Sequence, residues 1–95
     1  MGQKEAYLEK IEAQLKVWSA KIEELKAKAE KASADKKIEL HQMIDDLRAR
    51  KEQAQKNLNE IKAAGAETWE KLKSKTDEAM DDVKTFWESV KTKLQ

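Results

Sequence analysis

Only a few residues of this chain have types and spacings that could do chemistry. His41 is the only histidine, and Asp45 follows it one helical turn later, which could supply half of a metal site. Zinc and iron sites usually need three or four ligands. We therefore interpret His41 as a surface histidine beside a carboxylate, and we expect no metal and no cofactor.

Paired carboxylates stand at Asp45 and Asp46 and again at Asp81 and Asp82. A catalytic carboxylate needs burial or a close partner to shift its pKa, whereas both pairs fall on the polar sides of the helices expected below. The chain has no cysteine, no glycine-rich phosphate loop and no supported Ser–His–Asp set. We therefore expect no catalytic residues, no small-molecule substrate and no enzymatic activity.

One small basic cluster is formed by Arg48, Arg50 and Lys51, and Asp46 and Glu52 flank it. The whole chain is nearly balanced, with 20 Lys and Arg against 19 Asp and Glu. A nucleic-acid-binding surface needs a sustained basic field. The sequence therefore predicts no nucleic-acid partner.

The last third of the chain has a strongly one-sided pattern when it is placed on a helical wheel. Its apolar side consists of Trp69, Leu72, Val83, Phe86, Trp87, Val90 and Leu94. Lysines border this side, at Lys73, Lys84 and Lys91 on one edge and at Lys75 and Lys93 on the other. Such a face suits the core of a bundle, but boundary lysines also suit a membrane surface. It is our candidate lipid or partner face.

The elements that carry these residues follow from three apolar seams with alternating spacings of three and four. The first consists of Leu8, Ile11, Leu15, Trp18, Ile22, Leu25, Ala29 and Ala32. The second consists of Leu40, Ile44, Leu47, Lys51, Ala54, Leu58 and Ile61. The third consists of Trp69, Leu72, Thr76, Ala79, Val83, Phe86 and Val90, with Met80, Trp87 and Leu94 widening its face. We expect the large apolar members to form the core.

Two slips of one residue interrupt the seams, and each rotates the apolar stripe by about a hundred degrees. The second slip contains Gly65, a natural C′ residue, and Thr68, a candidate N-cap. The first contains Ser33 and Asp35, both of N-cap type, but no glycine. We expect helices over about 4–32, 36–63 and 67–94, packed as an all-α antiparallel three-helix bundle in one domain, 1–95.

An alternative is a single helix over 4–63 with the third helix folded back on it, as a long helical hairpin that oligomerises. Acid-to-base pairs at i,i+4 favour helix in either case. These are Glu12–Lys16, Glu24–Lys28, Asp46–Arg50, Glu52–Lys56 and Glu67–Lys71.

Residues 6–32, 43–62 and 68–83 resemble a family of small bacterial coiled-coil proteins that is loosely labelled as stress-response proteins. The residues that carry the resemblance are the Tyr7–Leu8 start, Trp18 and the Trp69 beginning of the last helix. The family has no established molecular activity and shows apolipoprotein-like amphipathic helices. The resemblance implies a bacterial setting connected with stress, and no site residues.

Taken together, the patterns favour a non-enzymatic structural or protein-interaction bundle that acts by coiled-coil packing. Its expected partner is a second copy of the chain or another helical protein. The alternative is a protein that lays its last helix on a membrane surface. No apolar run reaches the ~18–20 residues of a membrane span or forms a signal peptide, so we expect a cytoplasmic location.

Overall fold

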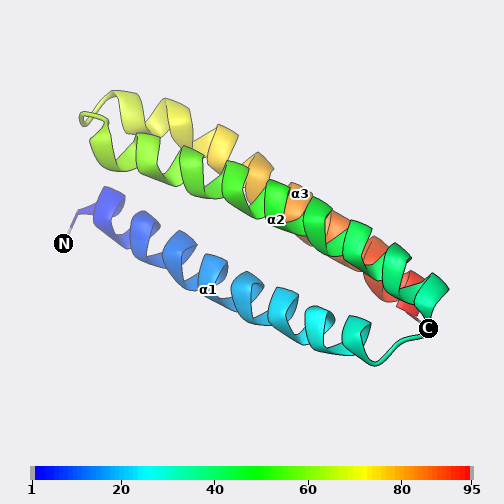
Figure 1. Ribbon diagram of the computed structural model, residues 1–95. Coiled ribbons are helices and arrows are strands. Elements are labelled where there is room, and N and C mark those ends of the chain that lie inside the picture. The colour runs from blue at the N-terminus through cyan, green and yellow to red at the C-terminus, as the bar shows by residue number, and fades with distance from the viewer. Residues whose placement is uncertain (1, 95) are drawn as a thin grey trace.

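The computed structural model describes residues 2–94, and these form three long helices (Figure 1). α1 spans Gln3–Glu30, α2 spans Ala34–Ala63 and α3 spans Thr68–Leu94. Successive helices are antiparallel, so the start of α1 lies beside the α2–α3 turn and the end of α3 lies beside the α1–α2 turn. The molecule is a rod with extents of 50 × 19 × 19 Å. The predicted three-helix bundle is confirmed.

The first break falls at residues 31–33, so the alternative of one helix over 4–63 is wrong. α1 ends in a tightened turn, in which the backbone N–H groups of Lys31 and Ala32 donate to carbonyls three residues earlier, each at 3.2 Å. Ser33 is the N-cap of α2, with extended backbone (φ −63°, ψ 162°) and no side-chain capping hydrogen bond. Its carbonyl accepts the N–H four residues later at 2.7 Å. A helix can thus end without glycine when its last turn tightens.

The second break contains Gly65 at the C′ position expected for it, directly after the C-cap Ala64. However, no described residue has a positive φ, so Gly65 does not adopt the left-handed conformation that favours glycine there. Ala64 redirects the chain through an extended backbone (φ −81°, ψ 150°). The Trp69 N–H then donates to the Gly65 carbonyl at 3.1 Å. Thr68 is therefore the first residue of α3, and its expected N-cap role is wrong.

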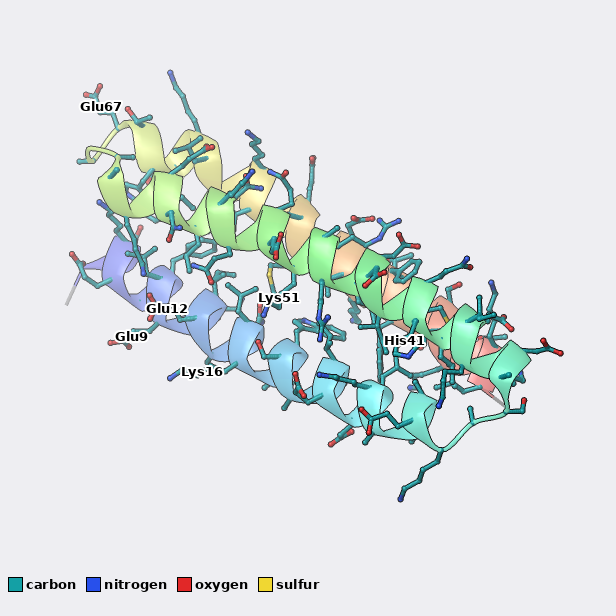
Figure 2. All side chains as sticks on the ribbon, in the orientation of Figure 1. Glu9, Glu12, Lys16, His41, Lys51 and Glu67 are labelled. Atoms are coloured by element: carbon teal, nitrogen blue, oxygen red, sulfur yellow. The ribbon has the colours of Figure 1, made fainter. Side chains whose placement is uncertain are left out.

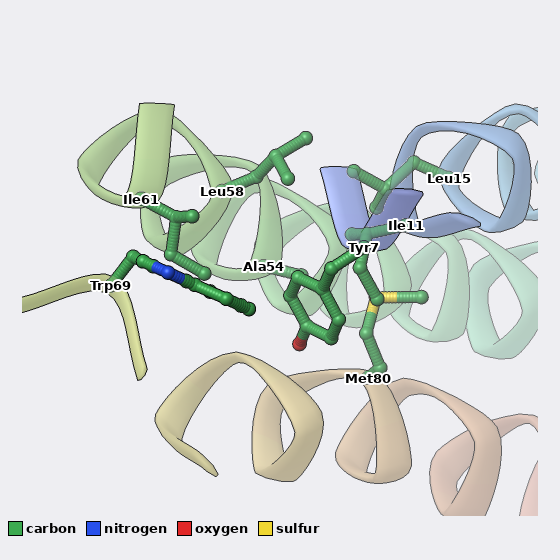
Figure 3. Packing of buried hydrophobic residues seen from close by; sticks show 8 residues of the cluster. All are labelled: Tyr7, Ile11, Leu15, Ala54, Leu58, Ile61, Trp69 and Met80. Atoms are coloured by element: carbon green, nitrogen blue, oxygen red, sulfur yellow. The ribbon is translucent and has the colours of Figure 1, made fainter. Parts of the chain in front are cut away.

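The buried core follows the predicted seams and divides into two clusters along the rod. The cluster nearer the α2–α3 turn, shown in Figure 3, consists of Tyr7, Ile11, Leu15, Ala54, Leu58, Ile61, Trp69 and Met80. The cluster nearer the α1–α2 turn consists of Ile22, Leu25, Ala29, Leu40, Met43, Ile44, Leu47 and Val90. Val83 is also fully buried. The predicted core positions Leu8, Trp18, Leu72 and Phe86 are only partly buried and pack against these clusters.

α2 is the central helix, because it packs along both α1 and α3, whereas the backbones of α1 and α3 seldom approach each other. α1 and α3 are parallel to each other, because each is antiparallel to α2. The space between α1 and α3 is therefore filled by long side chains rather than by close packing of the two backbones.

Polar contacts fix α1 only along its first two thirds. Lys4 Nζ donates to the Ala64 carbonyl at 2.7 Å, where it meets the negative end of α2. Farther along, Lys51 Nζ donates to Ser19 Oγ at 2.8 Å, and Lys51 lies on the side of α2 that faces α1 (Figure 2). Residues 20–30 make no side-chain hydrogen bond or ion pair to another helix among the described residues. That segment is held by apolar contacts and by the Lys21 ammonium group, which lies 5.4 Å from the Trp87 ring centroid of α3.

The ion pairs of the described residues mostly join different helices. They are Arg50–Asp82 at 2.6 Å, Lys62–Glu12 at 2.7 Å, Lys75–Glu60 at 3.9 Å and the single-helix pair Lys91–Glu88 at 3.9 Å. None of the five expected i,i+4 pairs forms an ion pair in the described structure. Two members of those pairs, Glu12 and Arg50, pair instead with Lys62 and Asp82 on a neighbouring helix, and helical spacing alone does not reveal such partners.

Candidate functional site

The candidate face of α3 is divided by the fold. Trp69, Val83 and Val90 are buried in the core, and Leu72, Phe86 and Trp87 are partly buried. Leu94 is 37% exposed. Trp69 packs against Tyr7 near the α2–α3 turn, with ring centroids 6.0 Å apart. Trp87 and Leu94 of this face line a surface hollow between α3 and α1, and Trp69 lines a separate, more open hollow at the α2–α3 turn.

The surface between α1 and α3 contains two hollows, which together we call the α1–α3 groove. The hollow nearer the α2–α3 turn, which we call the upper hollow, has a volume of about 330 Å³ and is lined by Gln14, Val17, Trp18, Met80, Asp81 and Lys84. The lower hollow, of about 300 Å³, is lined by Lys21, Glu24, Leu25, Lys28, Trp87, Lys91 and Leu94. Helices that do not pack closely leave such space between their side chains.

Two tryptophans meet in this groove. Trp18 lines the upper hollow and Trp87 lines the lower one, and their rings meet edge to face with centroids 6.0 Å apart at 70°. Lys21 Nζ lies 5.0 Å from the Trp18 ring centroid and 5.4 Å from that of Trp87. This edge-to-face pair under an ammonium group is a favourable aromatic and cation–π arrangement. It keeps both rings together although each stays partly open to solvent.

Val17 is the most conspicuous residue of the groove. It is 53% exposed, although a β-branched apolar side chain on a helix gains most by being buried. Leu94 is exposed in the lower hollow. Single exposed apolar residues are ordinary, but these two share one groove with two half-buried tryptophans.

The lining of the groove carries more positive than negative charge. Four of its residues are lysines, Lys21, Lys28, Lys84 and Lys91, and two are acids, Glu24 and Asp81. Glu88 offsets part of this charge, because it lies 3.9 Å from Lys91. The groove is therefore an apolar channel with a basic border.

The hollow between α1 and α2 is different in kind. Its lining includes Glu12 and Lys62, which pair with each other, and Lys51, which bonds Ser19. The pairing with Lys62 lowers the pKa of Glu12, through a hydrogen bond and through charge attraction. These polar groups already satisfy one another, so this hollow has less to offer a ligand than the α1–α3 groove.

In the first half of α3, Asp77 Oδ1 accepts a hydrogen bond from the Tyr7 hydroxyl at 2.6 Å. Burial and then the Asp77 carboxylate raise the pKa of Tyr7 well above its ordinary value. A tyrosine whose neutral form is stabilised in this way acts as a hydrogen-bond donor that joins α1 to α3. In Figure 3 its hydroxyl points toward α3.

Other residues considered from the sequence are scattered. His41 is exposed, and no group of three or more metal-ligating side chains occurs among residues 2–94. The Arg50 guanidinium donates hydrogen bonds to the Asp82 carboxylate and lies 4.5 Å from the Phe86 ring centroid. Arg50 of the basic cluster therefore contacts α3. Figure 2 shows the side chains over the whole rod.

Sequence reasoning missed the contribution of α1 to this site. Trp18 was expected in the core, and Val17 and Lys21 were not considered as site residues. The available signal was Val17 itself, an apolar residue adjacent to a seam tryptophan but outside the seam. Only the fold shows that its side of α1 faces the exposed edge of α3.

No helix within residues 2–94 combines the length and the apolarity that crossing a membrane requires. Comparison of the chain with models of protein families, with characterised proteins and with solved structures finds no match.

Proposed function

We propose that this chain is a non-enzymatic interaction protein that binds a helical segment of another protein in the α1–α3 groove. The observation that carries the proposal is the groove itself, with half-buried Trp18 and Trp87 and exposed Val17 and Leu94 on one surface. Aromatic and aliphatic side chains in shallow pockets are typical anchoring points for a docked helix. A stress-related role in the bacterial cytoplasm is a further proposal, supported only by the resemblance of the sequence.

Self-association through the heptad seams has less support. Most seam residues are already buried within one chain, as Ile11, Leu47 and Val83 illustrate. A second copy that docked its own groove on this one would bring the same four lysines toward each other, which is unfavourable. Another helical protein is therefore the partner that we favour.

Site-specific photo-crosslinking tests this proposal. A photoreactive phenylalanine derivative replaces Val17 in the groove, and in a matched control it replaces Ile38, which is 63% exposed on α2 and lines neither hollow. Both sites are exposed apolar positions in helices, so neither replacement should disturb the fold. We expect the Val17 probe to crosslink a helical segment of another protein in extracts of the native cells, and the Ile38 probe not to do so. Equal crosslinking at both sites, crosslinks only to further copies of this chain, or no protein crosslink at Val17 would contradict the proposal.

A membrane surface is the second candidate, because Trp87 and Leu94 are partly open on the same helix as Lys84 and Lys91. Trp suits the headgroup region, and lysines can reach lipid phosphates beside it. The test is co-sedimentation with anionic and neutral vesicles, using the double variant Trp87→Ser, Leu94→Ser. Phe86 is a poorer choice, because it packs on the core beneath Arg50. Charge-dependent binding that the double variant loses while it stays helical would favour the membrane; absence of binding would remove this candidate.

A further inference from the structure

The two hollows of the α1–α3 groove repeat each other at an interval of seven residues on both helices. On α1, Trp18 in the upper hollow is followed seven residues later by Leu25 in the lower one. On α3, Met80 is followed by Trp87 and Lys84 by Lys91. Because α1 and α3 are parallel, both displacements run in the same direction. The lower hollow is therefore the upper one shifted by one heptad.

Seven residues of helix span about 10 Å along the axis, since each residue rises about 1.5 Å. A docked helix presents side chains to its receptor at i, i+3, i+4 and i+7. Residues at i and i+7 of such a helix lie on one face and are separated by the same distance as the hollows. The spacing thus matches a helix whose two apolar anchors enter the two hollows, as knobs enter holes in a coiled coil.

The charges of the groove further define the partner. Lys21, Lys28, Lys84 and Lys91 stand beside the hollows, against Glu24 and Asp81 within the lining. Acidic residues that flank the anchors would pair with these lysines, whereas basic ones would be repelled.

Resting on the proposed function, we infer that the partner is an acidic amphipathic helix with large apolar residues at i and i+7, bound as a fourth helix along the α1–α3 groove. The apolar anchors fill the hollows on either side of the Trp18–Trp87 pair. The flanking carboxylates meet the lysine border. Binding changes the surroundings of both tryptophans, so their fluorescence reports it directly.

The test measures that fluorescence in the full chain carrying Trp69→Phe, which removes the tryptophan outside the groove; circular dichroism checks that this variant stays folded. The first probe is a synthetic alanine- and glutamine-based helix without aromatic residues, with leucine at i and i+7 and flanking glutamates. The second has the same composition with leucines at i and i+11. These leucines still share a face, since seven and eleven residues both return to within ~20° of the starting direction, but they lie about 16 Å apart. The third keeps the i and i+7 leucines and replaces the glutamates with lysines.

We expect the first peptide to bind at least about tenfold more tightly than the other two, because each of them loses either one anchor or the charge match. Higher salt should weaken this binding, since exposed charges are screened. Val17→Ser and Leu94→Ser should each weaken it, and Ile38→Ser should leave it unchanged.

The failures are distinguishable. Equal binding of the first two peptides overturns the inferred spacing, and equal binding of the first and third overturns the inferred charge. If Val17→Ser still weakens that binding, the groove remains a helix-binding site. Binding that is indifferent to both Val17→Ser and Leu94→Ser overturns the inference and contradicts the proposed function. No tryptophan response to any peptide overturns the inferred partner, and a response to anionic vesicles in its place points to lipid.

Discussion

Leu47 on α2 is wholly buried among apolar side chains from the cluster nearer the α1–α2 turn. Removing most of its side chain leaves a cavity that the surrounding helices can only partly fill. We predict that Leu47→Ala lowers the free energy of unfolding by about 2–5 kcal/mol. Ile38→Ala on the same helix is the control, and it should change the stability by less than about 0.5 kcal/mol because Ile38 is 63% exposed. Urea unfolding followed by circular dichroism measures both, and equal effects would show that the packing is wrong.

Tyr7 gives a prediction with a defined pH dependence. Its pKa is raised in the folded protein, by burial and by Asp77, so the folded state holds the hydroxyl proton more tightly than the unfolded state does. The hydrogen bond therefore stabilises the fold fully below the ordinary tyrosine pKa of about 10 and loses its effect as the pH rises above that value. We expect Tyr7→Phe to cost about 1 kcal/mol near neutral pH.

The measurement is chemical unfolding of both proteins at several pH values between neutral and strongly alkaline. Lysines titrate in the same alkaline range, so the relevant quantity is the difference between wild type and Tyr7→Phe, in which their common contribution cancels. That difference should shrink as the pH rises above about 10. A difference that stays constant, or grows, would mean that the hydroxyl is not a proton donor to Asp77.

The helices are the scale at which the sequence was most informative. The seams and their two phase slips predicted all three helices to within two residues at each end, because burial of a stripe imposes the heptad period. Where two apolar residues are adjacent, the seams did not predict which of the two is buried. Tyr7 is buried and Leu8 only partly so, and Met80 is buried more deeply than Ala79. A one-residue choice of this kind depends on how neighbouring helices rotate, and a single helix does not determine that.

The candidate site was predicted only on the α3 side. The helical wheel identified Trp87 and Leu94 as members of an apolar face, but it could not show that Trp69 and Val90 of the same face are buried in the core. Nor could it show that Val17 of α1 would join them, because this depends on which pair of helices packs least closely.

Gly65 tests the geometry of the α2–α3 turn. Its φ is not positive, and a Cβ added there would meet nothing within 4 Å. Alanine therefore fits the native backbone and also restricts the unfolded chain, so we predict that Gly65→Ala stabilises the protein by about 0.4–1 kcal/mol. A glycine needed for left-handed backbone would give the opposite sign. Thermal unfolding decides between them, because a lower melting temperature would contradict the turn as described.

The molecule as a whole is asymmetric around α2. α2 packs along both neighbours, and its packing with α3 is the more extensive. α1 makes hydrogen bonds to the other helices in its first two thirds, such as Lys4–Ala64 and Tyr7–Asp77. Its last third relies on the buried Ile22, Leu25 and Ala29 and on the contact of Lys21 with the Trp87 ring. The groove runs between α1 and α3, the two helices whose backbones pack least closely. The surface proposed for binding therefore coincides with the weakest contact between helices.

This asymmetry predicts the order in which the helices open. Regions with fewer tertiary contacts open at a lower free energy than the core does. In native-state hydrogen exchange we expect the amides of α1, and first those of residues 20–30, to exchange at lower denaturant than those of α2 and α3. A helix docked in the groove contacts both α1 and α3, so the first peptide described above should raise the protection of α1 more than that of α2, because a ligand stabilises the closed state to which it binds. Exchange of all three helices in one cooperative step, or protection gained mainly in α2, would show that α1 is an equal partner in the bundle and that the groove is not where the peptide binds.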